Sequence, residues 1–192
     1  DKMGIRMLHA YGMTEATPIV TIGNFKSHMQ SFDDDARMEI RSKQGFPVPG
    51  LDMRLVDEAG QDLPWDGEQR GELLLRGPWI ASEYLNDPRS ADTFIDGWYH
   101  TGDIATVDAE GYVQIVDRAK DMVKSGGEWI SSVDLENHIC ALPGVAQAAV
   151  VAQPHSKWDE RPVALVIRAD GEDLAAEDVI ELIRVEQSNG DF

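Results

Sequence analysis

The hydrophobic pattern of this 192-residue chain changes near residue 117, and no other feature constrains its fold as strongly. Before this point, from about residue 45, the apolar runs are short and are separated by Gly, Pro and Asp. Such a pattern is typical of a small β-barrel or sandwich. It predicts four strands: Met53–Val56, Gly71–Arg76, Ala105–Val107 and Tyr112–Val116.

The residues after this change alternate between strand and helix patterns. Ser132 or Asp134 is expected to cap the first helix. The predicted order is a helix ending at Ala141, strands Val145–Ala152 and Val163–Arg168, and a helix over residues 175–185. We therefore predict a mixed α/β and β chain of two domains, a β-rich one over residues 1–116 and a small α+β one over residues 117–192.

Two segments near the N-terminus lead into the barrel-like part. Residues 5–11 are mostly apolar and are expected to form a short buried strand that ends at a polar turn. The acidic run Asp33–Asp35 is expected to be a solvated loop.

Charge and cysteine content exclude some classes of function. The chain has 35 acidic and 17 basic residues and a net charge of −18, so non-specific binding to nucleic acid is not expected. It contains one cysteine, Cys140, and no apolar run of about 18 residues that would span a membrane. We expect a cytoplasmic protein without a transmembrane segment.

Three polar clusters are expected to lie on turns, outside the predicted strands and helices, and carry the residue types of a nucleotide site. The first is Tyr11–Ala16, where an aromatic face, an open glycine backbone, a hydroxyl and a carboxylate suit a base, a phosphate and Mg²⁺. The second is Gly97–Asp103, whose aspartate offers two acceptor oxygens to a ribose diol. For each of these clusters alone, a purely structural turn is the alternative.

The third cluster, Asp117–Ser131, places three cations within seven residues of an otherwise acidic chain. Arg118 and Lys124 are suited to neutralising phosphate or carboxylate oxygens. The Gly126–Gly127 pair permits close approach of a ligand, and Trp129 offers an apolar wall. A surface hairpin with solvated lysines is the alternative for this cluster.

Together the clusters resemble the adenylate-forming enzymes, which include acyl-CoA synthetases, luciferases and peptide-synthetase adenylation domains. The motifs Tyr-Gly-Met-Thr-Glu-Ala, Gly-Glu-Leu-Leu-Leu-Arg-Gly, Tyr-His-Thr-Gly-Asp and Asp-Arg-Ala-Lys-Asp-Met-Val-Lys-Ser-Gly-Gly-Glu-Trp-Ile-Ser occur in the order found in that family. The resemblance implies the end of a large N-terminal domain, consisting of a strand and a β-barrel subdomain, followed by a small mobile C-terminal domain.

The resemblance also implies roles for the first cluster. The tyrosine that matches Tyr11 stacks on adenine, and Gly12 and Met13 line the same pocket. The position of Thr14 contacts the α-phosphate, and that of Glu15 holds Mg²⁺. Thr14 and Glu15 are thus expected to be catalytic.

The other two clusters receive roles in the same way. Asp103 matches the residue that binds the ribose hydroxyls, Ile115 an apolar contact to adenine, and Arg118 a ribose or phosphate contact. Asp117 falls on the hinge about which the C-terminal domain rotates between two half-reactions.

The loop that begins at Lys124 is expected to reach the active site after that rotation. Lys124 is expected to be catalytic, as are Thr14 and Glu15. Gly126, Gly127 and Trp129 are expected to line the pantetheine tunnel of coenzyme A.

The activity implied is that of a fatty acid–CoA ligase that uses ATP, Mg²⁺ and coenzyme A and releases AMP and pyrophosphate. Trp129 favours the medium- and long-chain branch. The partners are small molecules, with a homodimer expected through residues outside this chain. Two family elements are missing, a triphosphate loop and a lysine near the C-terminus, so this chain is expected to be a fragment that is inactive alone. The alternatives are a non-catalytic nucleotide- or CoA-binding module and an adenylation domain that loads a carrier protein.

Overall fold

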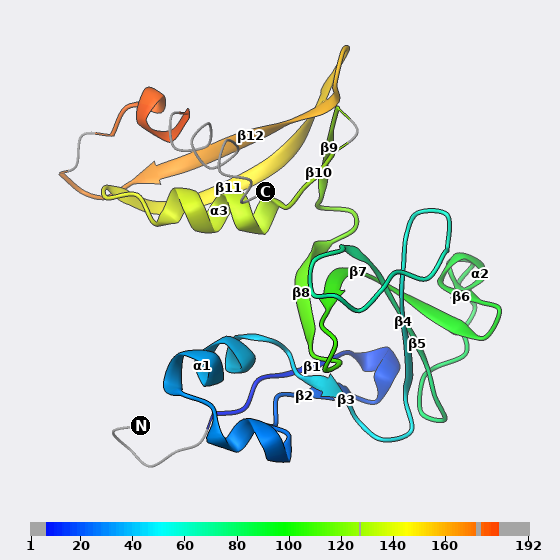
Figure 1. Ribbon diagram of the computed structural model, residues 1–192. Coiled ribbons are helices and arrows are strands. Elements are labelled where there is room, and N and C mark those ends of the chain that lie inside the picture. Colours follow the sequence, from blue (N-terminus) through cyan, green and yellow to red (C-terminus); the bar gives the residue numbers. More distant parts are fainter. Residues whose placement is uncertain (1–6, 127, 172–173, 181–192) are drawn as a thin grey trace. The chain divides into compact units, whose positions relative to one another are not determined.

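The computed structural model describes residues 7–126, 128–171 and 174–180, and it divides into two compact units, residues 1–115 and 116–192 (Figure 1). The boundary falls inside strand β8 (Val113–Arg118). No helix among the described residues is long and apolar enough to cross a membrane.

The first unit begins with a small three-stranded antiparallel sheet in the order β1-β2-β3. Its strands are β1 (Ala10–Gly12), β2 (Ile19–Ile22) and β3 (Phe46–Pro47). The expected buried strand over residues 5–11 is wrong, because the strand starts at Ala10 and the side chains of Met7 and Leu8 are exposed. Residues 5 and 6 lie outside the described residues.

Between β2 and β3 lie the 3₁₀ helix η2 (Ser27–Ser31) and helix α1 (Asp34–Ser42). The prediction of a loop at Asp33–Asp35 is also wrong. Asp33 caps α1 by accepting a 2.9 Å hydrogen bond from the backbone amide of Ala36. The next two acidic residues occupy the first helical turn, where the helix dipole stabilises negative charge.

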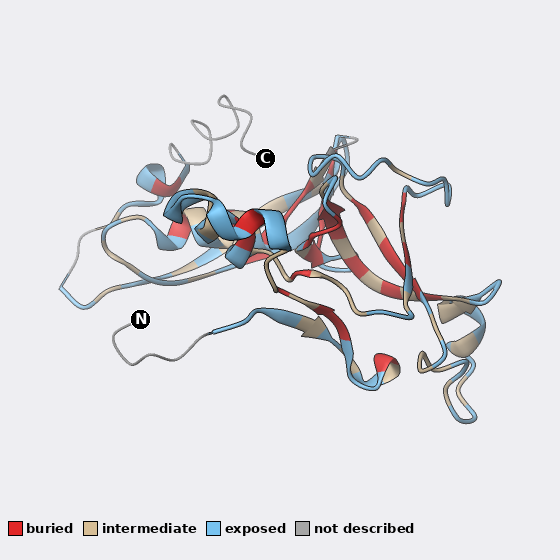
Figure 2. Ribbon diagram, turned by 60° about the horizontal axis from the view of Figure 1, so that its bottom comes forward, coloured by how far each residue is buried: buried red, intermediate tan, exposed pale blue. Residues whose placement is uncertain are grey.

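A five-stranded sheet forms the rest of the first unit, with β4-β5-β7-β6 in order and β8 paired with β7. Its remaining elements are β4 (Asp52–Val56), β5 (Gly71–Arg76), α2 (Ser90–Thr93), β6 (Phe94–Ile95) and β7 (Trp98–Val107). The sheet curls, and buried segments, red in Figure 2, lie along its strands. The buried residues of this sheet include Leu55, Leu73, Leu75 and Val107. The predicted strand Ala105–Val107 is the end of the longer β7.

The second unit packs a helix on an antiparallel sheet in the order β10-β9-β12-β11. The elements are β9 (Val123–Ser125), β10 (Glu128–Ile130), α3 (Ser132–Cys140), β11 (Val145–His155) and β12 (Asp159–Arg168). Leu135 and Ile139 of α3 pack on Val150 of β11, and Ser131, not Ser132 or Asp134, caps the helix. Residues 176–180 are helical, and the end of the helix predicted over 175–185 lies outside the described residues.

The mixed α/β fold class predicted from the sequence is confirmed. Both units combine antiparallel strands with short helices, and the curled sheet of the first unit resembles half of a barrel. The two units are separate compact bodies, while the functional labels of the two predicted domains stay predictions.

Candidate functional site

A bulge in β7 presents the second polar cluster. Glu72 of β5 pairs with Ile104 of β7, and Leu74 of β5 pairs with His100 of β7. One residue of β5 therefore lies opposite three residues of β7. Gly102 lies in the bulge with φ +68°, a backbone conformation that favours glycine. The expectation that this cluster forms a turn outside any strand is therefore wrong.

Hydrogen bonds from β5 hold the bulge. The Glu72 carboxylate accepts a 3.1 Å bond from the Gly102 amide and contacts the His100 ring at 3.0 Å. The Thr101 hydroxyl donates to the carbonyl of Leu73 at 2.8 Å and accepts from the Asp103 amide at 3.0 Å. These hydrogen bonds fix the backbone at Asp103, which is buried, with 3% of its area exposed.

The first and second clusters meet through Tyr11 and Asp103. The Tyr11 hydroxyl donates a hydrogen bond to Oδ2 of Asp103, although the two residues are 92 positions apart in the sequence. Burial raises the pKa of Tyr11 well above its usual range, and the hydrogen bond to Asp103 raises it further. Tyr11 is therefore a neutral donor, and the pair combines an aromatic ring with a carboxylate.

The turn after Tyr11 requires glycine. A Cβ atom on Gly12 would lie 1.9 Å from the carbonyl oxygen of Pro18. The Met13 amide donates to that same oxygen at 2.8 Å, which closes the loop around the 3₁₀ helix η1 (Thr14–Ala16). Thr14 at the start of η1 is exposed.

Glu15 faces a group of aromatic side chains. Its carboxylate accepts a 2.7 Å hydrogen bond from the Tyr84 hydroxyl, and its carbonyl accepts from the Ala81 amide at 2.8 Å. Burial, followed by the negative charge of Glu15, raises the pKa of Tyr99 above its usual range. Phe94 lies between the two tyrosines, with its ring 5.3 Å from that of Tyr84 and 5.2 Å from that of Tyr99.

Glu15 alone supplies only one of the ligands that a magnesium ion needs. Within the described ranges, no group of three or more His, Cys, Asp or Glu side chains is arranged to hold a metal ion. Mg²⁺ on a nucleotide, however, commonly uses one or two protein carboxylates and takes its other ligands from phosphates and water. A single partly buried carboxylate beside exposed Thr14 is compatible with that donor set.

Two further predicted residues pack against the hydrophobic core of the first unit. Met13 and Ile115 are partly buried and pack against the hydrophobic cluster that Tyr11 also contacts. The Ile115 amide donates a 2.8 Å hydrogen bond to the side-chain oxygen of Gln44, which fixes the last residue of the first unit. Tyr11, Met13, Asp103 and Ile115 are thus brought together within one unit.

In the second unit Asp117 is bound to the start of α3. Its Oδ2 atom accepts hydrogen bonds from the amide and the hydroxyl of Ser132, both at 2.8 Å, while Oδ1 accepts from the Arg118 amide at 2.7 Å. Asp117 is 5% exposed, and a carboxylate at this position complements the positive end of the helix. Arg118 itself is exposed, and its carbonyl accepts from the amides of Asp121 and Met122.

The third cluster forms the β9–β10 hairpin. Lys124 and Trp129 are opposite each other in the ladder, and the Lys124 ammonium lies 3.9 Å from the centre of the Trp129 ring. Gly126 has φ +63°, and a Cβ on it would lie 3.0 Å from the ring of Trp158. Gly127 lies outside the described residues. A surface hairpin was the alternative expected for this cluster, and the cluster does form a hairpin, while its ligand-binding role stays a prediction.

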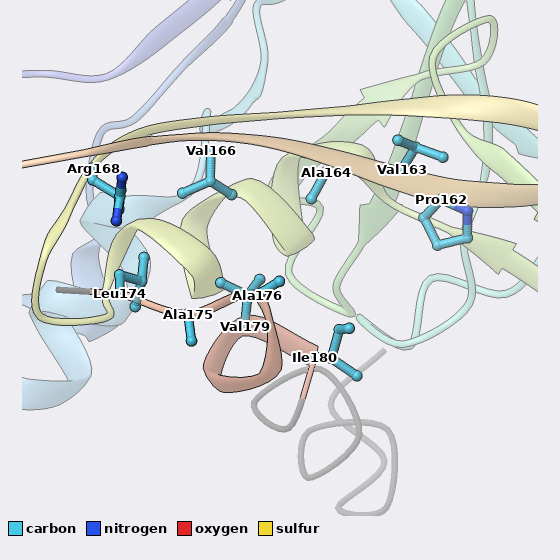
Figure 3. A pocket seen from close by; sticks show the side chains of 10 residues that line it. All are labelled: Pro162, Val163, Ala164, Val166, Arg168, Leu174, Ala175, Ala176, Val179 and Ile180. Atoms are coloured by element: carbon cyan, nitrogen blue, oxygen red, sulfur yellow. The ribbon is translucent and has the colours of Figure 1, made fainter.

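A separate cavity of about 510 Å³ lies in the second unit between β12 and residues 174–180 (Figure 3). Its lining is mostly apolar and includes Val166, Leu174, Val179 and Ile180, with Arg168 at one end. It contains none of the predicted site residues.

Several residues that support the site were missed in the sequence. Glu72 holds the bulge, and it lies in the Gly-Glu-Leu-Leu-Leu-Arg-Gly motif, to whose side chains no role was assigned. Tyr84 binds Glu15, and it lies outside the three polar clusters. The Ser131-Ser132-x-Asp134 pattern is a capping signal that could have identified α3 correctly. No local signal marks Gln44 or Glu160, because each acts on a distant strand.

Comparison with known proteins gives two family matches. Residues 1–85 match the family described as AMP-binding enzyme, and residues 134–189 match the AMP-binding enzyme C-terminal domain.

The curated relatives are CoA ligases. The chain is 46% identical over 169 residues to a long-chain-fatty-acid–CoA ligase of Thermus thermophilus, which covers 87% of this chain and 31% of the relative. It is 42% identical over 180 residues to a medium-chain-fatty-acid–CoA ligase of Ectopseudomonas oleovorans, which covers 93% of this chain and 33% of the relative. The chain thus spans about a third of the length of the curated relatives it matches.

Solved structures agree with this result. ATP-bound MatB from Rhodopseudomonas palustris matches with a TM-score of 0.78 and 31% identity over 95% of this chain and 34% of that one. The o-succinylbenzoate CoA synthetase MenE of Bacillus subtilis, in complex with its acyl-adenylate, matches with a TM-score of 0.77 and 25% identity over 96% of this chain and 35% of that one.

Proposed function

Since the chain belongs to the AMP-binding enzyme family, we propose that it is part of an ATP-dependent acid–thiol ligase that makes an acyl-CoA through an acyl-adenylate. The observation that carries the proposal is the hydrogen bond between Tyr11 and Asp103, which joins two separate motifs at one place in the first unit. The family matches support ATP and CoA as the substrates.

The proposed adenosine site uses residues of the first unit. The Tyr11 ring, with Gly12, Met13 and Ile115, forms the adenine side, and the Asp103 carboxylate accepts from the ribose hydroxyls. Asp103 is almost fully buried and is bound by the Tyr11 hydroxyl. Because a carboxylate has two acceptor oxygens, ribose hydroxyls can donate to Asp103 beside the Tyr11 hydroxyl or in its place.

The proposed chemistry then follows from charge. A carboxylate substrate attacks the α-phosphorus of ATP, pyrophosphate leaves, and the thiol of coenzyme A displaces AMP from the resulting mixed anhydride. In this proposal the Thr14 hydroxyl donates to the α-phosphate, and Arg118 and Lys124 supply positive charge. Mg²⁺ held by Glu15 would offset the negative charge of the phosphates during transfer.

Asp117 is proposed as the hinge between the two half-reactions, with Gly126, Gly127 and Trp129 as the wall for pantetheine. A fatty acid of medium or long chain is the proposed acyl substrate, supported by the relatives at 42–46% identity. The expected cytoplasmic location, and the expected homodimer through residues outside this chain, stay predictions.

The nucleotide site can be tested directly on this chain. We expect isothermal titration with AMP to show binding, and Asp103→Ala to weaken it at least about tenfold because two charge-assisted hydrogen bonds are lost. Asp92→Ala, which removes an exposed carboxylate of α2, is the matched control. Unchanged AMP affinity in Asp103→Ala, or the same loss in both variants, would refute the assignment.

A further inference from the structure

The β9–β10 hairpin, which carries Lys124 and Trp129, is attached to the rest of its sheet at the start of β12. Within the described residues, the β9–β12 ladder is recorded at one pair, Ser125 opposite Asp159. The hairpin's own two strands are joined by three such pairs. The position of the hairpin on the sheet therefore depends strongly on the residues around Asp159.

Those residues form a tight turn. Asp159 has φ +63°, in the left-handed region that non-glycine residues seldom adopt. The Glu160 amide donates to the carbonyl of Trp158 at 2.8 Å across this turn. A backbone conformation of this kind persists only where the surrounding structure holds it.

Two hydrogen bonds connect the turn to the hairpin. The carbonyl of Trp158 accepts a 3.1 Å bond from the Gly126 amide. The carboxylate of Glu160 accepts a 2.8 Å bond from the Lys124 amide. The turn thus grips the hairpin at the lysine and at the glycine of its tip.

Side chains add to this grip. The Trp158 ring lies against Gly126, so closely that a Cβ there would be 3.0 Å from it. The Lys157 ammonium lies 4.3 Å from the centre of the same ring. The hairpin thus carries one lysine–tryptophan pair and the turn that contacts its tip carries another, and Glu160 binds the backbone amide of the lysine in the hairpin pair.

We propose that Glu160 is a positioning residue that fixes Lys124, and with it the Lys124–Trp129 pair, in the geometry that receives coenzyme A. The part of this statement that concerns coenzyme A rests on the proposed function. Glu160 does not touch the ligand in this proposal. It acts through the Lys124 amide, which is the group that its carboxylate binds.

The experiment compares three variants of this chain with the parent. Glu160→Ala removes the acceptor, and Glu160→Gln keeps an acceptor oxygen while it removes the charge. Glu177→Ala removes an exposed glutamate elsewhere in the same unit and is the control. The readouts are hydrogen exchange of the Lys124 amide by NMR and the dissociation constant for coenzyme A by calorimetry.

We expect Glu160→Ala to speed exchange of the Lys124 amide and to weaken coenzyme A binding, each about fivefold or more, as for loss of one charge-assisted hydrogen bond. Glu160→Gln is expected to restore most of both effects. If exchange is unchanged in Glu160→Ala, Glu160 does not hold the hairpin and the proposal is wrong. If exchange changes while affinity does not, its positioning role is wrong.

The proposed function fails in a different way. If the parent chain shows no coenzyme A binding at all, the role of the hairpin in the ligase is refuted. The exchange comparison between Glu160→Ala and Glu160→Gln still decides whether Glu160 positions Lys124.

Discussion

The Asp117 carboxylate accepts hydrogen bonds from both the backbone amide and the hydroxyl of Ser132, each 2.8 Å long, and so adds a second cap to helix α3 beside that of Ser131. This side chain is 5% exposed and belongs to the compact second unit. If Asp117 serves as a hinge, its backbone dihedrals must change while its side chain stays bound. The adjoining residue Val116 is the first of the second unit, directly after Ile115, which Gln44 holds in the first.

Replacement of Asp117 is therefore expected to destabilise the second unit. Asp117→Ala leaves the amide of Ser132 without its acceptor at a buried helix end, which should cost about 2–3 kcal/mol of unfolding free energy. Asp117→Asn keeps an acceptor oxygen and should cost less. Urea unfolding followed by circular dichroism measures both, with exposed Asp121→Ala as the control. Equal stability of the alanine variant and the parent would contradict the capping role.

The raised pKa of Tyr11 predicts a change in stability at alkaline pH. Because the folded state keeps the phenol neutral, Tyr11 contributes stability that is fully present below its unfolded pKa of about 10 and is lost as the pH rises above it. Tyr11→Phe lacks this contribution. Its unfolding free energy should be lower than that of the parent at neutral pH but should fall less steeply above pH 10.

Urea unfolding at intervals from pH 7 to pH 11.5 checks this expectation. The other tyrosines are present in both proteins, so their ionisation cancels in the comparison. Parallel curves for the two proteins above pH 10 would show that burial and Asp103 do not act on Tyr11 in this way.

Elements defined by interactions between residues near in the sequence could be predicted, and those held by distant residues could not. Strand β5 was predicted with the observed bounds, Gly71–Arg76, because alternating and buried apolar side chains define it locally. Strand β7 was predicted too short because its bulge places Gly, Thr and Asp inside a strand. The bulge is held by Glu72 on the neighbouring strand, and no local pattern reveals that contact.

The same reasoning applies to the site. The three clusters were visible as unusual combinations of Tyr, Gly, Asp and Lys, and the structure places Tyr11 against Asp103. Their supporting residues, such as Tyr84 and Gln44, were not visible, because a single polar residue that binds a distant partner leaves no periodic signal. The acidic run at Asp33 was misread because charge alone does not distinguish a loop from a helix N-terminus.

Gly12 is expected to be intolerant of any side chain. A Cβ atom there would overlap the Pro18 carbonyl, 1.9 Å away, and the loop cannot yield without breaking the bond from the Met13 amide to the same oxygen. Gly12→Ala should lower the unfolding free energy by about 3 kcal/mol or more. It should also abolish AMP binding, since Tyr11 and Met13 flank this position.

Gly60→Ala provides the comparison. This glycine also lies in a turn, and a Cβ on it meets nothing within 4 Å, but its φ of +76° is unfavourable for alanine. A loss of only about 1 kcal/mol and normal AMP binding are expected. If urea unfolding gave similar losses of unfolding free energy for the two variants, the close approach of Pro18 would not be the reason that position 12 requires glycine.

Trp129 is expected to contribute to coenzyme A binding in this chain. Its ring is stacked under the Lys124 ammonium, so removal of the ring takes away both an apolar wall and a cation–π contact. We expect Trp129→Ala to weaken coenzyme A binding about tenfold and Trp129→Phe to weaken it less. Trp65→Ala, in the first unit, is the control for calorimetry. An unchanged dissociation constant in Trp129→Ala would argue against the pantetheine wall.

The last expectation concerns turnover. This chain spans about a third of the curated ligases that it matches, and by resemblance the loop that holds the β- and γ-phosphates and the adenylating lysine are not among its 192 residues. Cationic groups that neutralise the negative charge of the departing phosphates are a major part of catalysis in phosphoryl-type transfers. We therefore expect the chain to bind AMP but to release no pyrophosphate when mixed with ATP, Mg²⁺ and a fatty acid. A coupled pyrophosphate assay tests this, with a full-length ligase as positive control. Turnover of about 1 s⁻¹ or faster would show that the residues present here suffice for adenylation.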